Sequence, residues 1–194
     1  MSDELFTRTF EKNLARRPLR ELSLANGAAR AAVMAIVRRA NGGVEICFIK
    51  RSRHPLDRFS GHIAFPGGAR EENDPDMLAT AIRETREETG MEVENHGKIL
   101  GRLDDETPRG NTDKNRREYL VNVFVCALFS DTGVSDLEMR ISDDEVDEIF
   151  WIPADELRRG GSPEKPEFFH HERRIWGMTA RIVDKLLECI PPQA

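Results

Sequence analysis

Three glutamates near the end of one segment are the residues whose types and spacing point most directly to chemistry. Glu84, Glu87 and Glu88 lie in residues 78–89, where apolar side chains recur at helical spacing and which Gly90 ends. The helix dipole disfavours carboxylates at this end, and glutamates three or four residues apart repel each other by about 0.2–0.5 kcal/mol. Hard divalent cations such as Mg²⁺ bind through carboxylate oxygens and would offset that repulsion. We therefore expect the three glutamates to be ligands of Mg²⁺ or Mn²⁺.

The residues around the glutamates support a metal site. Arg83 lies four residues before Glu87, so its guanidinium can hold that carboxylate and leave the other two for the metal. Gly67 and Gly68 follow an apolar run, and glycine allows the backbone to approach a ligand closely. For the RETREE hexapeptide alone, a solvated helix face is the better explanation. The flanking glycines favour the metal site.

The same residues carry a resemblance to a known family. Residues 83–91, RETREETGM, match the second half of the Nudix box, R-E-U-x-E-E-x-G-U, with Thr85 at a position that usually holds a bulky apolar residue. Through this motif the chain resembles the Nudix hydrolases, over roughly residues 30–185. The first half, G-x5-E-x7-R, is not matched, because Pro75 stands where the acid is expected. The role of that acid stays unassigned among Glu71, Glu72, Asp74 and Asp76, of which Asp74 is six residues after Gly68.

The expected fold has two sources. The resemblance implies the Nudix α/β/α sandwich, with a mixed β-sheet between helices, whereas the residue pattern alone indicates only an α/β or α+β class. We expect residues 1–25 to form an N-terminal helical segment, interrupted near Pro18, and residues 26–194 to form a single Nudix hydrolase domain. The expected strands are 29–38, 44–50, 62–65, 98–104, 118–129 and 145–151, and the expected later helices are 78–89, 153–158 and 175–190.

Aromatic residues and a loop complete the expectations for the last third of the chain. Residues 164–174 are expected to be a loop. Trp151 and Trp176 are expected in the core rather than as platforms for a nucleobase. Phe168 and Phe169, which charged residues flank, are expected to be exposed.

The resemblance also implies a reaction, the hydrolysis of the phosphoanhydride in a substrate X-diphosphate-Y. Bound Mg²⁺ or Mn²⁺ would neutralise the diphosphate and lower the pKa of a coordinated water. A backbone carbonyl near Gly68 is implied as a further metal ligand, and Arg83 as the residue that orients a glutamate. The general base stays open: it is a box glutamate, Glu84 or Glu87, or an acid of a later loop, Asp143, Asp144, Glu145 or Glu148.

Basic residues before the box indicate the substrate class. Residues 48–52 and 61–68 resemble the corresponding segments of Nudix coenzyme A diphosphatases, with an interval that is one residue longer. The basic residues expected to contact the substrate are Lys50, Arg51 and Arg58, since basic side chains bind phosphate oxygens. Gly67 is expected to contact it as well, since glycine lets the backbone approach a ligand closely. Coenzyme A or a derivative is the expected substrate. ADP-ribose, a nucleotide sugar or a dinucleotide is the alternative, and a non-catalytic nucleotide-binding module is a third.

Composition narrows the partners. The 194 residues carry a formal net charge of −6 and no long basic run, so we expect no nucleic acid partner. No apolar stretch is long enough to cross a membrane, so no membrane partner is expected. Three scattered cysteines favour a reducing, cytoplasmic location. A homodimer through residues 1–25 stays open.

Overall fold

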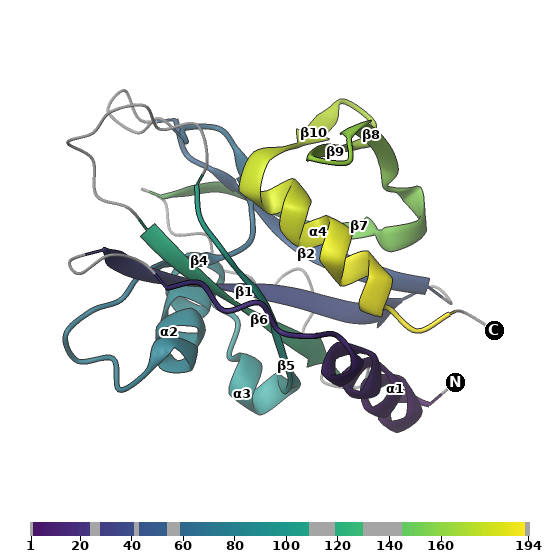
Figure 1. Cartoon of the computed structure of the whole chain (residues 1–194), viewed down its shortest axis with the longest axis horizontal. Helices are drawn as coiled ribbons and strands as arrows, with labels where there is room; N and C mark the ends of the chain where they lie inside the picture. The colour runs from purple at the N-terminus through teal and green to yellow at the C-terminus, as the bar shows by residue number, and fades with distance from the viewer. Residues whose placement is uncertain are drawn as a thin grey trace.

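This computed structural model, drawn in Figure 1, describes residues 2–23, 28–40, 43–53, 59–108, 119–129 and 145–192. The helices are α1 (Asp3–Arg16), α2 (Met77–Thr89), α3 (Val93–His96), the short 3₁₀ helix η1 (Ala154–Glu156) and α4 (Gly177–Cys189). The strands are β1 (Ala29–Ala40), β2 (Gly43–Arg51), β3 (Ile63–Ala64), β4 (Gly67–Ala69), β5 (Gly97–Glu106), β6 (Tyr119–Leu128), β7 (Val146–Pro153), β8 (Arg158–Ser162), β9 (Lys165–His170) and β10 (Arg173–Ile175).

One mixed sheet contains seven of these strands. The order is β3-β2-β1-β6-β5, with β4 paired to β1 and β7 paired to β2. The β1–β6 pair is parallel and the others are antiparallel. Residues 31–33 of β1 pair with β4, whereas residues 37–40 pair with β2. The two glycines of β4 are therefore held against the first half of the central strand.

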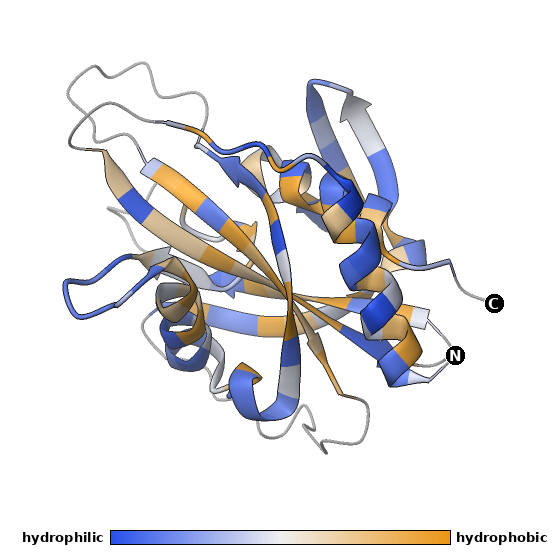
Figure 2. Cartoon of the chain, turned by 60° about the horizontal axis from the view of Figure 1, so that its bottom comes forward, coloured by the Kyte–Doolittle hydropathy of each residue, from blue (hydrophilic) through white to orange (hydrophobic). Residues whose placement is uncertain are grey.

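Helices cover both faces of this sheet. Val33, Ala35 and Val37 of β1 pack into one apolar cluster with residues of α1 and α4, whereas Met34 and Ile36 pack into another with residues of α2 and α3. A strand that is buried on both faces needs apolar residues at every position, which explains the continuous apolar run in β1. Figure 2 shows these hydrophobic residues along the central strands, and Figure 1 shows α2 and α4 on opposite sides of them. The expected α/β/α sandwich with a mixed sheet is confirmed.

The N-terminal helix belongs to the same core as the sheet. α1 ends at Arg16, before Pro18, rather than continuing to residue 23. Its Phe6 and Phe10 are buried in the cluster that also contains residues of β1 and α4. The boundary expected between residues 25 and 26 lies outside the described residues, so the division of the chain stays a prediction. None of the helices in the described ranges combines the length and the apolar character of a membrane span.

Three expectations for the last third of the chain are wrong. Residues 164–174 are not a loop, because β9 and β10 pair with β8 in a second, three-stranded sheet. Phe168 is only 1% exposed, because this small sheet packs it into the main core. Trp176 is 45% exposed rather than buried, because it stands just before α4, outside the apolar clusters. Trp151 is half-buried against the core, as expected.

Candidate metal and active site

Helix α2 is limited by the two residues that cap it. The Asp76 side chain accepts a hydrogen bond of 2.8 Å from the Ala79 N–H at the start, and Gly90 adopts a left-handed φ of 71° at the end. Thr85, the polar residue at an apolar position of the Nudix box, is fully buried. Its hydroxyl donates to the Ala81 carbonyl at 2.7 Å, so the polar group is satisfied inside the helix.

Two glutamates of α2 lie directly against the glycines of β4. The Gly67 N–H donates to Glu88 Oε2 at 2.8 Å. A Cβ on Gly68 would overlap the Glu84 carboxylate, and a Cβ on Gly67 would overlap the Ala32 carbonyl, with Gly67 at a φ of +150°. Position 67 therefore requires glycine, and a side chain at position 68 would displace the Glu84 carboxylate, so the two glycines let the helix carboxylates approach the β4 backbone.

Burial disfavours the charged forms of the two glutamates. Glu88 is 1% exposed, and burial raises its pKa to about 7, although the Gly67 N–H and Arg51 oppose the shift. Burial also raises the pKa of Glu84, against the effect of Arg83. The nearest described cation to Glu88 is Arg51, whose Nη1 lies 3.9 Å from Glu88 Oε1. The carboxylate oxygens of Glu84 and Glu88 lie beside the backbone of Gly67 and Gly68. Such a set of oxygen ligands fits Mg²⁺ or Mn²⁺.

Arg83 contacts several of the residues around the α2 glutamates. Its guanidinium contacts Glu84 Oε1 at 3.0 Å and Glu87 Oε2 at 2.8 Å, and donates to the Ala69 carbonyl at 3.0 Å. It also donates twice to Asp74, each time at 3.1 Å. Arg83 thus joins the loop, β4 and the helix, and its role in orienting a glutamate stays a prediction.

Asp74 is the acid whose position the sequence left unassigned. In addition to Arg83, it accepts hydrogen bonds of 2.9 Å from the Thr80 hydroxyl and from the Glu71 N–H. The hydrogen bonds from Arg83 hold the pKa of Asp74 well below its ordinary value, although burial opposes the shift. Of the four acids that the sequence left open, Asp74 contacts Arg83 through both of its oxygens, whereas Glu71 lies 3.7 Å from it.

The other predicted site residues lie at different distances from this cluster. Glu87 is turned toward Arg83, with 53% of its side chain exposed. Glu145 lies close enough that its charge raises the pKa of Glu84 and of Glu88, and its carbonyl accepts from the Ser52 N–H at 2.9 Å. Lys50 pairs in the sheet with Ile63 and Glu148, one residue before Arg51. Arg58, Asp143 and Asp144 lie outside the described residues.

A second group of ligating side chains lies on η1 and the β9–β10 turn. One ligand atom each from Glu156, His170 and His171 lies within 4.8 Å of the other two. Among the described residues, the carboxylate oxygens of Glu84, Glu87 and Glu88 do not all lie within 4.8 Å of one another. The Glu87 carboxylate instead contacts Arg83. Imidazole nitrogens suit transition metals, whereas Mg²⁺ and Mn²⁺ prefer oxygen donors, so the α2 group is the better fit to the expected ions.

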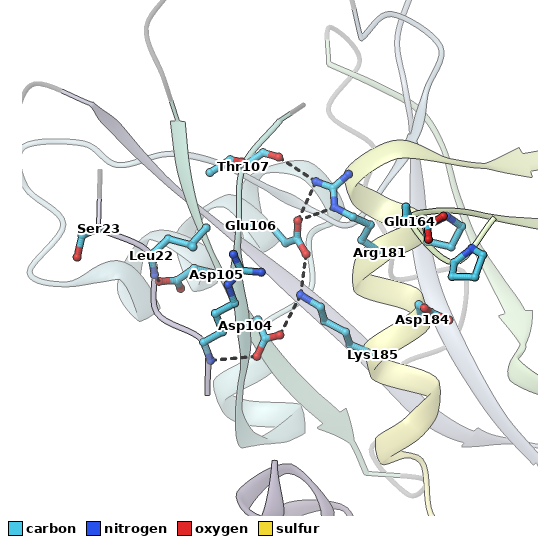
Figure 3. A pocket seen from close by; sticks show the side chains of 13 residues that line it. Leu22, Ser23, Asp104, Asp105, Glu106, Thr107, Glu164, Arg181, Asp184 and Lys185 are labelled. Carbon is cyan, nitrogen blue, oxygen red and sulfur yellow. Dashed lines mark hydrogen bonds and ion pairs between the residues drawn. The ribbon is translucent and has the colours of Figure 1, made fainter. Parts of the chain in front are cut away.

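A cavity of about 560 Å³ lies on the α4 side of the sheet, away from the α2 glutamates. Figure 3 shows the ion pairs that line it: Arg181 and Lys185 of α4 each bond Glu106 at 2.7 Å, and Lys185 also lies 3.1 Å from Asp104. The cations that α4 contributes are thus engaged by carboxylates of β5. This cavity therefore suits an anionic diphosphate poorly, and the candidate active site stays at α2 and β4.

Comparisons with known proteins agree with this geometry. The family model of the NUDIX domain matches residues 28–171. The mitochondrial coenzyme A diphosphatase NUDT8 of Mus musculus is 30% identical over 178 residues, which cover 84% of this chain and 79% of that protein. The uncharacterized Nudix hydrolase NudL of Escherichia coli O1:K1 / APEC is 32% identical over 171 residues, which cover 80% of this chain and 79% of that protein.

A solved structure supports the fold. The MutT/nudix family protein from Enterococcus faecalis superposes with a TM-score of 0.56 at 16% identity, covering 96% of this chain and 73% of that one. The fold and the box thus define the class, an α/β/α sandwich with a glutamate-bearing helix beside a glycine turn. The chain belongs to the Nudix family, and it is a pyrophosphohydrolase.

Proposed function

We propose that this Nudix hydrolase requires Mg²⁺ or Mn²⁺ and cleaves the diphosphate linkage of coenzyme A or a derivative of it. The observation that carries the proposal is the placement of Glu84 and Glu88 against Gly67 and Gly68, with Arg51 beside them. The names of the mammalian relatives support the substrate class. A nucleotide that carries a diphosphate brings the negative charge that a metal ion and Arg51 would bind.

Each residue of the cluster has a proposed role in this reaction. Glu84, Glu87, Glu88 and a backbone carbonyl near Gly68 would hold the metal, which when bound neutralises the diphosphate and makes a water more acidic. Arg83 holds Glu84 in place from the opposite side, while the Gly67 N–H orients Glu88.

The remaining groups act on the substrate and on protons. Arg51 would bind a diphosphate oxygen. Glu145 or a box glutamate, Glu84 or Glu87, would take a proton as the water oxygen bonds to phosphorus and the bridging P–O bond breaks. The products are two phosphate monoesters.

A release assay tests the substrate. Phosphomonoesters would be measured with a coupled phosphatase, in Mg²⁺ and in Mn²⁺, for coenzyme A, 3′-dephospho-coenzyme A, ADP-ribose, UDP-glucose, a diadenosine polyphosphate and NADH. We expect coenzyme A to be cleaved fastest, ahead of its dephospho form. A lead by ADP-ribose or a dinucleotide would discard the coenzyme A assignment, and inactivity on every compound would favour a nucleotide-binding module.

Substitutions test the residues. We expect Glu88→Gln and Glu87→Gln each to lower kcat by about 100-fold or more, since a ligand or proton acceptor is lost. Glu94→Gln, on the exposed face of α3, is the matched control and should leave kcat unchanged. Rates near wild type in both box variants would overturn the metal assignment.

We also propose a cytoplasmic location, which the cysteines support. Cys47, Cys126 and Cys189 are free and buried, as thiols in a reducing compartment would be. Fluorescence microscopy of the tagged chain in its own cells tests this location, and an organellar signal would contradict it.

A further inference from the structure

An aromatic patch lies on the surface where β3 meets the start of α4. The rings of His62 and Trp176 are 4.7 Å apart between centroids, and those of His62 and Phe59 are 5.9 Å apart. Trp176 is 45% exposed and Phe59 is 39% exposed. Exposed aromatic side chains that gather in one place can form a binding surface. We propose that this aromatic patch is the platform on which the nucleobase of the substrate stacks.

Capping of α4 gives no reason for a tryptophan at this position. Trp176 is the N-cap of α4, and its side chain makes no capping hydrogen bond, whereas Ser, Thr, Asp or Asn would cap the helix. Gly177, which follows, has a left-handed φ of 68° and turns the chain into the helix. An uncapped helix start and an exposed indole both disfavour folding. Such departures from local rules are expected at functional positions.

Backbone hydrogen bonds place the aromatic patch next to the candidate active site. The Arg51 N–H donates to the His62 carbonyl at 3.0 Å, and the Gly61 N–H donates to the Arg51 carbonyl at 3.0 Å. The Arg51 guanidinium in turn lies 3.9 Å from Glu88. Arg51 therefore joins the aromatic patch to the metal cluster through a fixed strand pairing.

A side-chain bond fixes the other half of the aromatic patch. The Thr179 hydroxyl of α4 donates to the Ile63 carbonyl of β3 at 3.2 Å, so the start of α4 is tied to the strand that His62 immediately precedes. The Arg174 guanidinium lies 5.8 Å from the centre of the Trp176 ring. The indole thus contacts one ring and lies near one cation, while 45% of it stays exposed.

The chemistry of the aromatic patch suits a planar base. Aromatic rings stack on any nucleobase, because every base has a π-face, so the aromatic patch selects for the presence of a base and not for its identity. A nucleotide whose diphosphate lies at the α2 glutamates would carry its base on the far side of Arg51. The inference rests on the proposed function in one respect, that the substrate is a nucleotide.

Fluorescence provides a binding test that does not depend on turnover. The chain contains two tryptophans, so Trp151→Phe leaves Trp176 as the single indole. We would titrate this variant in EDTA with AMP and, as the ligand that lacks a base, with ribose 5-phosphate. AMP should change the emission saturably and ribose 5-phosphate should not. No response to AMP, or an equal response to both ligands, would overturn the inference.

The reciprocal variant is the control for this titration. Trp176→Phe leaves Trp151, which is half-buried beneath Arg38 with the guanidinium 4.0 Å from the ring centre. Its emission should not respond to AMP. An equal AMP response in this variant would place the base elsewhere and overturn the inference.

Kinetics then connect the aromatic patch to the reaction. Trp176→Ala should raise KM by roughly 10- to 100-fold and change kcat little, because a base contact remote from phosphorus binds ground state and transition state alike. Trp176→Phe should retain most of the affinity and guards against loss of folding. Leu19→Ala, another exposed apolar residue, should leave KM unchanged. An unchanged KM in Trp176→Ala would contradict the platform.

The two proposals fail separately. A protein that binds AMP through Trp176 and hydrolyses no diphosphate would retain the platform and lose the proposed function. A protein that hydrolyses coenzyme A with no AMP response at Trp176 would retain the function and lose the platform.

Discussion

At the scale of single residues, the absence of a side chain at position 68 matters as much as the carboxylates. Glu84 occupies the space that a Cβ of residue 68 would need, and Arg83 holds Glu84 from the other side. A carboxylate that is held on both sides has one position relative to Glu88. This fixed spacing is what a metal ligand pair requires.

Gly68→Ala tests this requirement. The added methyl group should displace the Glu84 carboxylate, and a displacement of about 1 Å in a catalytic group lowers the rate by about 100-fold. We therefore expect kcat to fall by roughly that factor, together with Mn²⁺ affinity measured by electron paramagnetic resonance. Ala69→Ser, on the exposed neighbouring residue, is the control. Wild-type activity in Gly68→Ala would show that Glu84 does not need its observed position.

At the scale of elements, a buried ion pair between Asp74 and Arg83 helps to join the loop 70–76 to α2. Asp74 is only 6% exposed and accepts from Arg83 through both of its oxygens. Removal of one partner of such a pair leaves the other charge without compensation and costs about 3 kcal/mol. Because Arg83 also holds Glu84, the loss of Asp74 should disturb the site as well as the fold.

Asp74→Asn tests both effects through the pH dependence of stability. Hydrogen bonds from Arg83 hold the pKa of Asp74 below its ordinary value of 3.8. The unfolded chain therefore takes up this proton at a higher pH than the folded chain does, and the stability from Asp74 is present above pH about 4 and lost below it.

Urea unfolding midpoints between pH 6 and pH 3 provide the measurement for Asp74. The wild type should lose stability as the pH falls through this range, whereas Asp74→Asn should start about 3 kcal/mol lower and fall less. Glu72→Gln, an exposed neighbour in the same loop, should follow the wild type. Parallel curves for Asp74→Asn and wild type would show that the ion pair does not stabilise the fold.

The elements differ in how far the sequence predicts them, for physical reasons. Helix α2 is predicted to within one residue, because Asp76 and Gly90 mark its ends chemically. The β8–β10 sheet is not predicted, since residues 158–175 contain few apolar side chains and no alternating pattern. These strands pair mainly with one another, and only a few side chains such as Phe168 and Ile175 reach the core.

The candidate site likewise contains residues that the sequence predicts and residues whose roles depend on the fold. The glutamates and glycines follow from motif spacing, whereas the role of Asp74 depends on where Arg83 reaches across a lengthened loop. The exposure of Trp176 is not predictable from residue type, since tryptophan is largely buried on average. It follows from the position of Trp176 at the N-cap of α4, which only the fold defines.

At the scale of the whole molecule, the sandwich brings together groups from opposite faces of one sheet. The α2 glutamates lie on one face, and α4, which Trp176 precedes, covers the other. Arg51, at the end of β2, contacts both the Glu88 carboxylate and the His62 backbone. A substrate that spans from metal to base would therefore cross the end of β2. Substrate binding at the metal site and substrate binding at the aromatic patch should then be linked through β2.

Metal binding should also stabilise the whole fold. A ligand that binds only the folded state at about 100 times its Kd adds about 2.7 kcal/mol, which for a chain of this size raises Tm by about 5–10 °C. We expect Mg²⁺ or Mn²⁺ to produce such a shift in a thermal melt and EDTA to reverse it. The Glu84→Gln/Glu88→Gln variant should lose the shift. Its metal-free form should be at least as stable as wild type, because burial disfavours the charges that the substitutions remove.

A second pair of substitutions decides which group of ligands is responsible. His170→Gln/His171→Gln removes the nitrogen donors near Glu156 and leaves α2 intact. We expect this variant to retain the full Tm shift with Mg²⁺ and Mn²⁺, because these ions prefer the oxygen donors of α2. If the shift disappeared in the histidine variant and persisted in the glutamate variant, the stabilising metal would lie at the β9–β10 turn, and the assignment of Glu84 and Glu88 as ligands would be wrong.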